Sequence, residues 1–369
     1  MADTRNLASK YAKKVDERFN LESQVAQALN NDYEFTGVKT VNIYSIPTAA
    51  MNDYTRSGTS RYGTPDDLTR NVQTHTIEKD RAFTFVIDKG DKKQSQNVME
   101  AGKALGRQMK EVWVPEFDTY VLRKLAAEAT ARGNFSSEAI TKENAYEQFL
   151  SAMEFLGNHN VPDKGRVCYC SYKFANFLKL DPSFMKTGDK SQGMVINGEI
   201  GEVDGCKIVK VPSSRLPAGC AFLITHKCAA AAPKQLEEYK THDNPPGING
   251  WLVEGRVIYD CFVMEEKGDA IFYHGDQAVL RILHVTTAHG NDGTTAKVLV
   301  NPGVPEGTNK FVYKMGTAAQ AVAYDADLSS WTALSKSGAS VTKGSNTHIT
   351  VAEVTSAGKA RGVGTALLK

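Results

Sequence analysis

Two carboxylates beside a proline are the first residues of this chain whose types and spacing could do chemistry. Glu116 and Asp118 follow Pro115 in a segment with helical spacing. Residues two positions apart point to different faces of a helix, so the pair lacks the geometry of an acid/base site. We interpret the carboxylates as acceptors for backbone groups that Pro115 leaves without a partner, or as partners of basic side chains.

Cysteines are the second candidate. Cys168 and Cys170 alternate in a β-rich stretch and therefore point to one face of a strand. A zinc site needs further ligands at CxxC-like spacing, and the sequence has none. Because no export signal is visible, we expect reduced, buried thiols that pack as small hydrophobic residues. The cysteines are Cys168, Cys170, Cys206, Cys220, Cys228 and Cys261.

Other enzyme motifs are incomplete or missing. Gly58 and Gly63 have P-loop spacing, but Thr64 and Pro65 stand where the lysine belongs. The sequence contains neither HExxH nor GxSxG, and its histidines are scattered. We therefore predict no catalytic, cofactor-binding or metal site, and a protein that is not an enzyme.

Charge and hydropathy exclude further classes. The 369 residues include 44 basic and 42 acidic ones, for a formal net charge of +2. Such a chain has no overall attraction to nucleic acid or to a membrane surface, although one face could still be basic. No run of about 18 apolar residues occurs, so we expect no membrane span. The length predicts two or three domains.

The first elements that position these residues form a hairpin. Residues 38–46 and 72–77 have strand composition, and the polar excursion 47–69 separates them. The hairpin has too few apolar residues to fold alone. A long excursion of this kind is usually functional, and we expect a neighbouring subunit to stabilise it.

A strictly alternating strand follows at residues 81–88. Phe83, Phe85 and Ile87 share one face, which we expect to point to the core. Charged residues stand at both ends of this strand, where they can reach partners or water; they are Asp80, Arg81 and Asp88.

A long helix is expected over residues 97–131, because apolar residues recur every three or four positions. Pro115 removes one backbone hydrogen bond, so the helix should kink or break near Val114. At 1.5 Å per residue, this helix would span roughly 50 Å, longer than an ordinary globular helix. Gly133 is expected to end the segment.

Short helices and strands are expected in the middle of the chain. One helix is expected to have Thr141 as its N-cap, Glu143 in its first turn and its end at Gly157. Two further helices are expected at 172–180 and 229–239. Strands are expected at 165–170, 203–211, 221–228, 251–264 and 270–274.

Composition shifts after about Leu283 towards Gly, Thr, Ser, Ala and Val. Turn signals separate short strands here, which predicts a small β domain with Trp331 near its core. The expected strands are 297–300, 310–315, 319–324 and 347–354. At the other end, residues 1–30 carry a narrow apolar stripe. This stripe fits either a terminal helix docked on its own domain or an arm that packs on a neighbouring subunit.

Three segments together resemble the major capsid proteins of tailed bacteriophages, which have the HK97 fold. Asp80–Asp91 resembles the return of the family's extended loop, Val114–Tyr120 a segment of its spine helix, and Gly250–Val263 the closing strand of its peripheral domain. The resemblance covers about residues 1–285. Each segment is weak alone, whereas the combination is fairly specific.

The resemblance implies an α+β fold with five parts. These are an N-terminal arm (1–30), an extended loop (31–80), a peripheral domain with the spine helix (81–162 and 245–285), an axial domain (163–244) near the five-fold and six-fold axes, and an appended C-terminal all-β domain (286–369), Ig-like or similar, outside the match.

The resemblance also implies the function. The chain would form hexamers and pentamers of itself, assemble in the host cytoplasm into an icosahedral virion shell around non-specifically bound double-stranded DNA, and meet portal and scaffolding proteins. It would have no membrane partner. We expect intersubunit or structural roles for Arg56, Arg61, Asp80, Arg81, Asp88, Pro115, Glu116, Asp118, Trp251 and Arg256.

Two alternatives remain open from the sequence. An encapsulin, a cellular shell of the same fold, would hold a cargo enzyme instead of DNA. A β-rich adhesin or binding module is suggested by residues 286–369 alone. The Lys–Asn cross-link of the family's namesake cannot be assigned to residues of this sequence.

Overall fold

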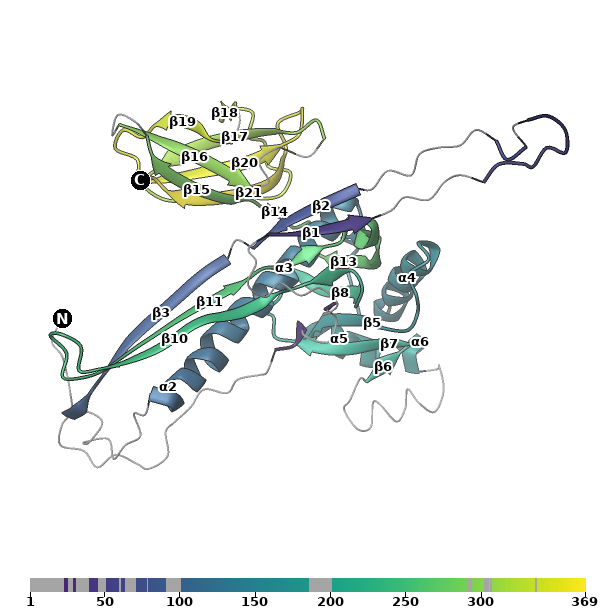
Figure 1. Ribbon diagram of the computed structural model, residues 1–369. Helices are drawn as coiled ribbons and strands as arrows, with labels where there is room; N and C mark the ends of the chain where they lie inside the picture. The colour runs from purple at the N-terminus through teal and green to yellow at the C-terminus, as the bar shows by residue number, and fades with distance from the viewer. Residues whose placement is uncertain are drawn as a thin grey trace.

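A long helix runs diagonally through the computed structural model, and the other elements are arranged around it (Figure 1). A narrow three-stranded ribbon lies alongside this helix, a mixed sheet with two helices lies at its other side, and the C-terminal strands form a body of their own. The structure describes residues 23–25, 29–30, 40–45, 51–59, 61–63, 71–77, 79–90, 101–185, 201–290, 294–301, 305, 307–335 and 337–369.

The long helix has a π-helical turn immediately before Pro115. It consists of α2 (Ala101–Gln108), the π turn η2 (Met109–Trp113) and α3 (Val114–Arg132). The expected interruption near Val114 therefore takes the form of a widened turn, in which Pro115 occupies the first turn of α3 and needs no N–H partner. Gly133 ends α3 in the left-handed conformation with φ 81°, as expected.

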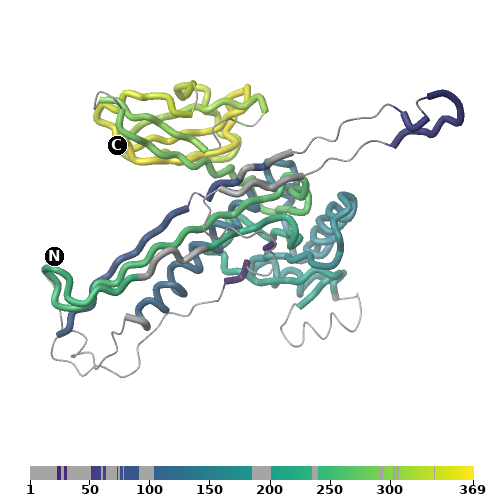
Figure 2. Tube along the Cα trace, in the orientation of Figure 1, coloured from purple at the N-terminus to yellow at the C-terminus, as the bar shows by residue number. Residues whose placement is uncertain are grey.

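The ribbon joins segments from distant parts of the chain. Strand β3 (Lys79–Asp88) pairs antiparallel with β11 (Gly250–Tyr259), which pairs in turn with β10 (Lys234–Asp243). Figure 2 shows β3 and β11 running together along the helix. On β3, Ile87 is buried and Val86 on the opposite face is 50% exposed, so the expected alternation is confirmed.

Two expectations for this region were wrong. Residues 229–239 form strands β9 (Ala230–Ala231) and β10, not a helix. The helix preference of these residue types is outweighed by the pairing of β10 with β11. Pro233 separates the two strands. The single strand expected over 251–264 divides into β11 and β12 (Phe262–Val263), with Asp260 and Cys261 between them.

A mixed six-stranded sheet forms the largest layer. Its order is β4-β13-β8-β5-β7-β6, with β5 and β7 parallel and β8 antiparallel to β5. The strands are β4 (Phe135–Ser136), β5 (Arg166–Ser171), β6 (Glu202–Val203), β7 (Cys206–Val211), β8 (Cys220–His226) and β13 (Ile271–Gly275). Strand β13 thus joins the sheet of residues 166–226, although the sequence assigned these two regions to different domains.

Two helices lie against this sheet. Helix α5 (Tyr172–Leu180) has the expected bounds, and its N-cap Ser171 accepts a hydrogen bond from the Phe174 N–H. Helix α4 (Ala145–Asn158) has Asn144 as its N-cap, and not Thr141 as expected. The Asn144 side chain instead accepts from the Thr141 N–H, so residues 141–144 form a turn. The short helix α6 (Pro182–Met185) follows α5.

The C-terminal strands pack as two sheets around one core. One sheet has the order β14-β21-β20-β17-β18 and the other β15-β16-β19. The strands are β14 (Arg281–Ile282), β15 (His284–His289), β16 (Thr295–Asn301), β17 (Lys310–Gly316), β18 (Thr332–Leu334), β19 (Ala339–Thr342), β20 (His348–Val354) and β21 (Ala360–Leu367). The strand expected at 319–324 is irregular; its Val322 and Tyr324 instead cover the outer face of the larger sheet together with Trp331.

The hairpin and the N-terminal residues both contact the body. Strands β1 (Thr40–Ser45) and β2 (Asn71–Thr76) pair antiparallel, as expected. Val25 is fully buried in the main core, and its carbonyl accepts a hydrogen bond from the Tyr169 hydroxyl at 3.0 Å. The two interpretations of residues 1–30 were a terminal helix docked on its own domain and an arm that packs on a neighbouring subunit. They otherwise concern residues that the structure does not describe.

Candidate functional site

A buried carboxylate joins three distant segments of the chain. Asp118 on α3 is fully buried and accepts hydrogen bonds from the Ser23 hydroxyl at 2.7 Å and the Gln24 N–H at 3.0 Å. It also pairs with the Arg215 guanidinium at 2.8 Å. A buried charge is costly unless it is paired and hydrogen-bonded, and this one is both. Asp118 therefore fastens the N-terminal segment and the loop before β8 to the long helix.

Glu116 faces the ribbon instead. Its carboxylate pairs with the Arg81 guanidinium at 2.9 Å and accepts a hydrogen bond from the Tyr259 hydroxyl at 2.8 Å. Burial, and then this hydrogen bond to a carboxylate, raises the pKa of Tyr259 well above its ordinary value. The tyrosine therefore stays a neutral donor, and Glu116 links α3 to both β3 and β11.

The remaining expected residues of the ribbon pair across its strands or at its tip. Arg256 on β11 makes a two-pronged contact with Asp80 on β3, with Nε donating to Oδ1 at 2.8 Å. Trp251 lies under the Lys89 ammonium, which is 5.7 Å from its ring. Asp88 accepts from the Gly90 N–H at 2.7 Å. These contacts hold the ribbon together within one chain.

Arg56 and Arg61 belong to the described segments 51–59 and 61–63 between β1 and β2. These segments form the tip of the hairpin and lie far from the body in Figure 1. The Arg61 Nε donates to the Gly58 carbonyl at 3.1 Å, and both arginine side chains are exposed. Apolar side chains are exposed beside them: Met51 is 98% and Tyr62 is 83% accessible. The tip thus presents cations and apolar surface together.

The base of the hairpin contacts the body through one face of β2 and the residue after it. Gln73 donates its side-chain amide to Glu265 at 3.1 Å, His75 packs on Phe262 with ring centroids 4.8 Å apart, and Ile77 is buried. Burial lowers the pKa of His75, although Asp260 and Glu265 oppose this shift. The docked hairpin therefore favours a neutral imidazole.

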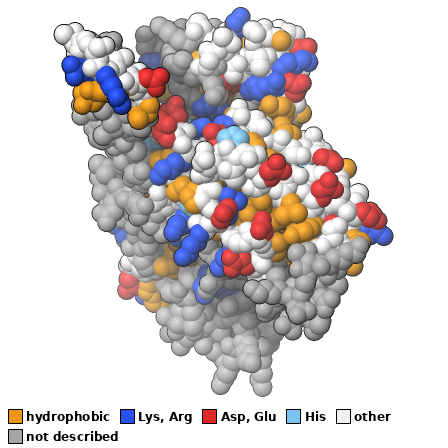
Figure 3. Space-filling model, turned by 90° about the vertical axis from the view of Figure 1, so that its right-hand side faces the viewer, with side chains coloured by type: hydrophobic (Ala, Val, Ile, Leu, Met, Phe, Trp, Pro, Cys, Tyr) orange, Lys and Arg blue, Asp and Glu red, His pale blue; other side chains and the backbone are white. Residues whose placement is uncertain are grey.

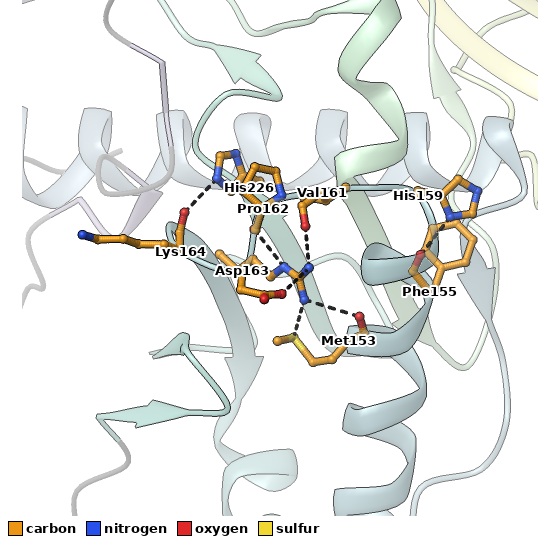
Figure 4. A network of polar contacts seen from close by, with 9 residues as sticks. Met153, Phe155, His159, Val161, Pro162, Asp163, Lys164 and His226 are labelled. Atoms are coloured by element: carbon orange, nitrogen blue, oxygen red, sulfur yellow. Dashed lines mark hydrogen bonds and ion pairs between the residues drawn. The ribbon is translucent and has the colours of Figure 1, made fainter.

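A second buried cation supports the turn that ends α4 (Figure 4). The Arg166 guanidinium donates to the carbonyls of Val161 at 2.6 Å, Pro162 at 3.1 Å and Met153 at 3.4 Å, and pairs with Asp163 at 2.8 Å. It thereby satisfies the carbonyls of Val161 and Pro162 in the loop between α4 and β5 and joins this loop to the Met153 carbonyl of the helix. These contacts give Arg166 a structural role.

The thiols behave as expected from the sequence. Of the six, five are buried and Cys228 is half-buried. Burial raises the pKa of Cys170, Cys206 and Cys261 to about 12. In the described part of the chain, no group of three or more His, Cys, Asp or Glu residues is arranged to hold a metal ion. In the same residues, no helix has the length and apolar character needed to cross a membrane.

The face of the molecule in Figure 3 carries described side chains of both charge signs. On the face in Figure 3, basic and acidic side chains are interleaved with apolar patches. This pattern agrees with the balanced composition.

Sequence reasoning missed Arg215, the buried partner of Asp118. It stands in an irregular segment 97 residues away from the carboxylate, and no local pattern marks it. It also missed Tyr120, whose hydroxyl donates to Asp260 at 2.7 Å. The position of Tyr120, two residues after Asp118, was the signal in the sequence that could have pointed to it.

Comparison with solved structures finds the same fold in bacteriophage capsids. A structure from Mycobacterium phage Che8 matches with a TM-score of 0.60 at 18% identity, covering 74% of this chain and 99% of that one. The capsid of cyanophage P-SCSP1u matches with a TM-score of 0.58 at 14% identity, covering 72% and 92%. The mature capsid of bacteriophage PhiM1 matches with a TM-score of 0.54 at 12% identity, covering 72% and 90%.

No protein-family model and no curated protein sequence matches the chain. At these identities the structural matches establish the fold. The mixed α+β class and the resemblance to the tailed-phage capsid fold are thereby confirmed.

Proposed function

We propose that this chain is the major capsid protein of a tailed bacteriophage. In this role, it assembles with copies of itself into the hexamers and pentamers of an icosahedral shell. The observation that carries the proposal is the fold: the chain covers nearly the whole length of the similar Che8 and P-SCSP1u chains. The virion is accordingly its proposed location.

We assign the elements to the parts that the resemblance implied, with two changes of bounds. Strand β10, inside the expected axial domain, belongs to the ribbon, and strands β4 and β13, inside the expected peripheral domain, belong to the sheet around β5 and β7. The helix α2–η2–α3 serves as the spine, the β1–β2 hairpin as the extended loop, and the β10–β11–β3 ribbon as part of the peripheral domain. The sheet around β5 and β7 serves as the axial domain. Residues 23–25 belong to an N-terminal arm that Asp118 and Tyr169 fasten to its own subunit.

The hairpin tip is the proposed contact with a neighbouring subunit. Its described residues, 51–59 and 61–63, include exposed apolar side chains and two cations, and none of them is buried, so the tip would gain stability by covering a partner surface. Asp118 is not a suitable partner for Arg56 or Arg61, because it is fully buried and paired with Arg215. Glu116 is bound to Arg81 of the same chain, but its side chain keeps 37% exposure.

We infer that the C-terminal sheets form an appended β domain. The alignments to the phage structures leave roughly a quarter of this chain uncovered, a share similar to that of residues 286–369. These strands have their own apolar cluster, which includes Val298, Phe311 and Val351. A chain that ends near Leu283 should still give the circular-dichroism spectrum and cooperative melting of a folded protein, and complete loss of folding would contradict an independent domain.

Packaged double-stranded DNA, a portal and scaffolding proteins are the further partners that the proposed function requires. The net charge of +2 gives the chain no overall attraction to DNA, so contact with packaged DNA would depend on a local basic face. An encapsulin-type shell would contain a cargo enzyme in place of DNA, and no feature of the described residues favours it.

Negative-stain microscopy of the full-length expressed chain tests the proposal. We expect closed particles of uniform size at suitable protein and salt concentrations. Monomers across all assembly conditions, including those with a co-expressed scaffolding protein, would overturn it. Particles purified from their source should contain double-stranded DNA, whereas a protein cargo without DNA would support the encapsulin alternative.

A further inference from the structure

A cysteine thiol and an imidazole lie side by side where the chain leaves strand β8. The Sγ atom of Cys228 is 2.8 Å from Nδ1 of His226, which is within hydrogen-bond distance. The His226 carbonyl accepts a hydrogen bond from the Ala229 N–H at 2.9 Å, and this bond closes a turn over residues 226–229. The turn therefore holds the backbone of both residues in place.

The other ring nitrogen of His226 determines where the imidazole carries its proton. Nε2 is 3.1 Å from the Lys164 carbonyl, a contact drawn in Figure 4. A carbonyl oxygen only accepts hydrogen bonds, so the neutral ring has its proton on Nε2 and a lone pair on Nδ1. Nδ1 accepts from the Cys228 N–H at 3.2 Å and also faces the thiol. The thiol therefore has a base within reach of its proton.

Burial and a glycine keep the ring in this orientation. His226 is 5% exposed, and a Cβ atom on Gly165 would lie 3.0 Å from its Nε2. Gly165 has φ 104°, a conformation that favours glycine, so this position leaves room for the imidazole. A nucleophile, a base within hydrogen-bond distance and a third group that orients the base are the parts of an activated nucleophile.

The thiol is more accessible than the ring that faces it. Cys228 is half-buried, whereas the other five cysteines are buried. The preceding residue, Lys227, is exposed. Reactive cysteines are partly exposed and lie next to a group that favours the thiolate, while buried structural cysteines are inert. Cys228 meets both conditions.

We propose that Cys228 and His226 form a nucleophilic pair, and that Cys228 is a site of covalent modification by small disulfides. The thiol proton moves to His226 Nδ1, and the thiolate attacks one sulfur of the disulfide, whose S–S bond breaks. A mixed disulfide forms on Cys228, and the departing thiolate takes the proton from Nδ1. The small disulfide is thus the oxidant, and one of its halves leaves as a thiol. The reaction occurs once per chain, and the inference does not depend on the proposed capsid function.

Reaction of the full-length protein with dithiodipyridine at about pH 7 tests the proposal, because this small aromatic disulfide releases an absorbing thiopyridone. We expect one thiol per chain to react first, and peptide mass spectrometry to place it on Cys228. It should react at least about fivefold faster than the cysteines of the chain unfolded in urea, since an ordinary thiol is only a few per cent thiolate at neutral pH. Glutathione with and without urea corrects for the effect of urea on the reagent. A rate at or below that of the unfolded chain overturns the proposal, and this comparison needs no variant.

His226→Asn separates the base from its structural place. The asparagine oxygen can still accept from the Cys228 N–H, but an amide does not take up the thiol proton. We expect this variant to keep its circular-dichroism spectrum and to slow the modification of Cys228 by about tenfold or more. An unchanged rate in the folded variant overturns the role of His226.

His159→Asn is the matched control. The His159 ring also contacts a carbonyl, that of Phe155 at 2.8 Å, but it lies at the end of α4 and not in the turn 226–229 (Figure 4). This variant should leave the rate at Cys228 unchanged. Equal slowing by the two histidine substitutions would also overturn the proposal.

Discussion

Asp118 and Arg215 form a buried ion pair of 2.8 Å between residues that are 97 positions apart in the chain. Asp118 stands on the long helix and Arg215 in the loop before β8, so the pair fixes the mixed sheet against the helix. The same carboxylate receives the Ser23 hydroxyl and the Gln24 N–H. Three segments of the subunit therefore depend on one side chain.

Substituting Asp118→Asn should destabilise the subunit strongly. The change removes the buried carboxylate from its pair with the Arg215 guanidinium, which should cost about 3–5 kcal/mol in the free energy of unfolding. Urea unfolding followed by circular dichroism measures this loss. The control is Glu143→Gln, in the exposed pair with Lys142, which should change stability by less than about 1 kcal/mol. Equal effects of the two substitutions would argue against a special role for Asp118.

Acid should loosen the base of the hairpin through His75. The pKa of this imidazole is lowered from 6.5 in the docked state, so the undocked state binds the proton first. Docking is therefore strongest above the ordinary pKa and is lost as pH falls through the lowered one. Asp260 and Glu265 moderate the effect, whereas Lys124 adds to it.

Hydrogen-exchange protection of the β2 amides, compared at about pH 7.5 and about pH 5.5, measures this loosening. We expect protection to fall at the lower pH in the unchanged protein and to change less in His75→Gln. His289→Gln, at an exposed position of β15, should behave like the unchanged protein. An identical fall in protection in all three proteins would remove His75 as the cause.

Removing the two cations of the hairpin tip should weaken assembly without destabilising the subunit. Arg56→Ala and Arg61→Ala change exposed side chains, so the free energy of unfolding should stay within about 0.5 kcal/mol. If the tip docks on an acidic neighbour surface, particle yield should fall and become more sensitive to salt. Yield and salt tolerance equal to those of the unchanged protein would sink the assignment of these arginines.

Cys228 should react with thiol reagents before the other cysteines. It is half-buried, whereas the other five are buried, and burial raises the pKa of Cys170, Cys206 and Cys261 to about 12. Because the thiolate is the reactive form, iodoacetamide at neutral pH should modify Cys228 and spare those three. Peptide mass spectrometry reads out the sites, and labelling in urea serves as the control in which all should react. Modification of Cys170 in the folded protein as fast as that of Cys228 would contradict this burial pattern.

The sequence by itself determined the elements whose local signals agree with their surroundings. The helix 172–180 has a serine cap and ends before a proline, and the alternating strand from Asp80 to Asp88 has one preferred face. The interruption at Pro115 followed from the missing N–H of proline. The three quoted segments pointed to the capsid fold, and the similar solved structures confirmed it.

Only the tertiary structure decided which residues meet. Residues 234–239 are of types that favour a helix, yet they belong to strand β10 because β11 lies beside them. The hydrogen bonds between the two strands outweigh a local helix preference of a few tenths of a kcal/mol. Asp118 had the same local pattern as Glu116, yet one is buried against Arg215 and the other faces Arg81. Residues two positions apart on a helix face different neighbours. The identity of those neighbours depends on contacts between residues about a hundred positions apart, which no local spacing records.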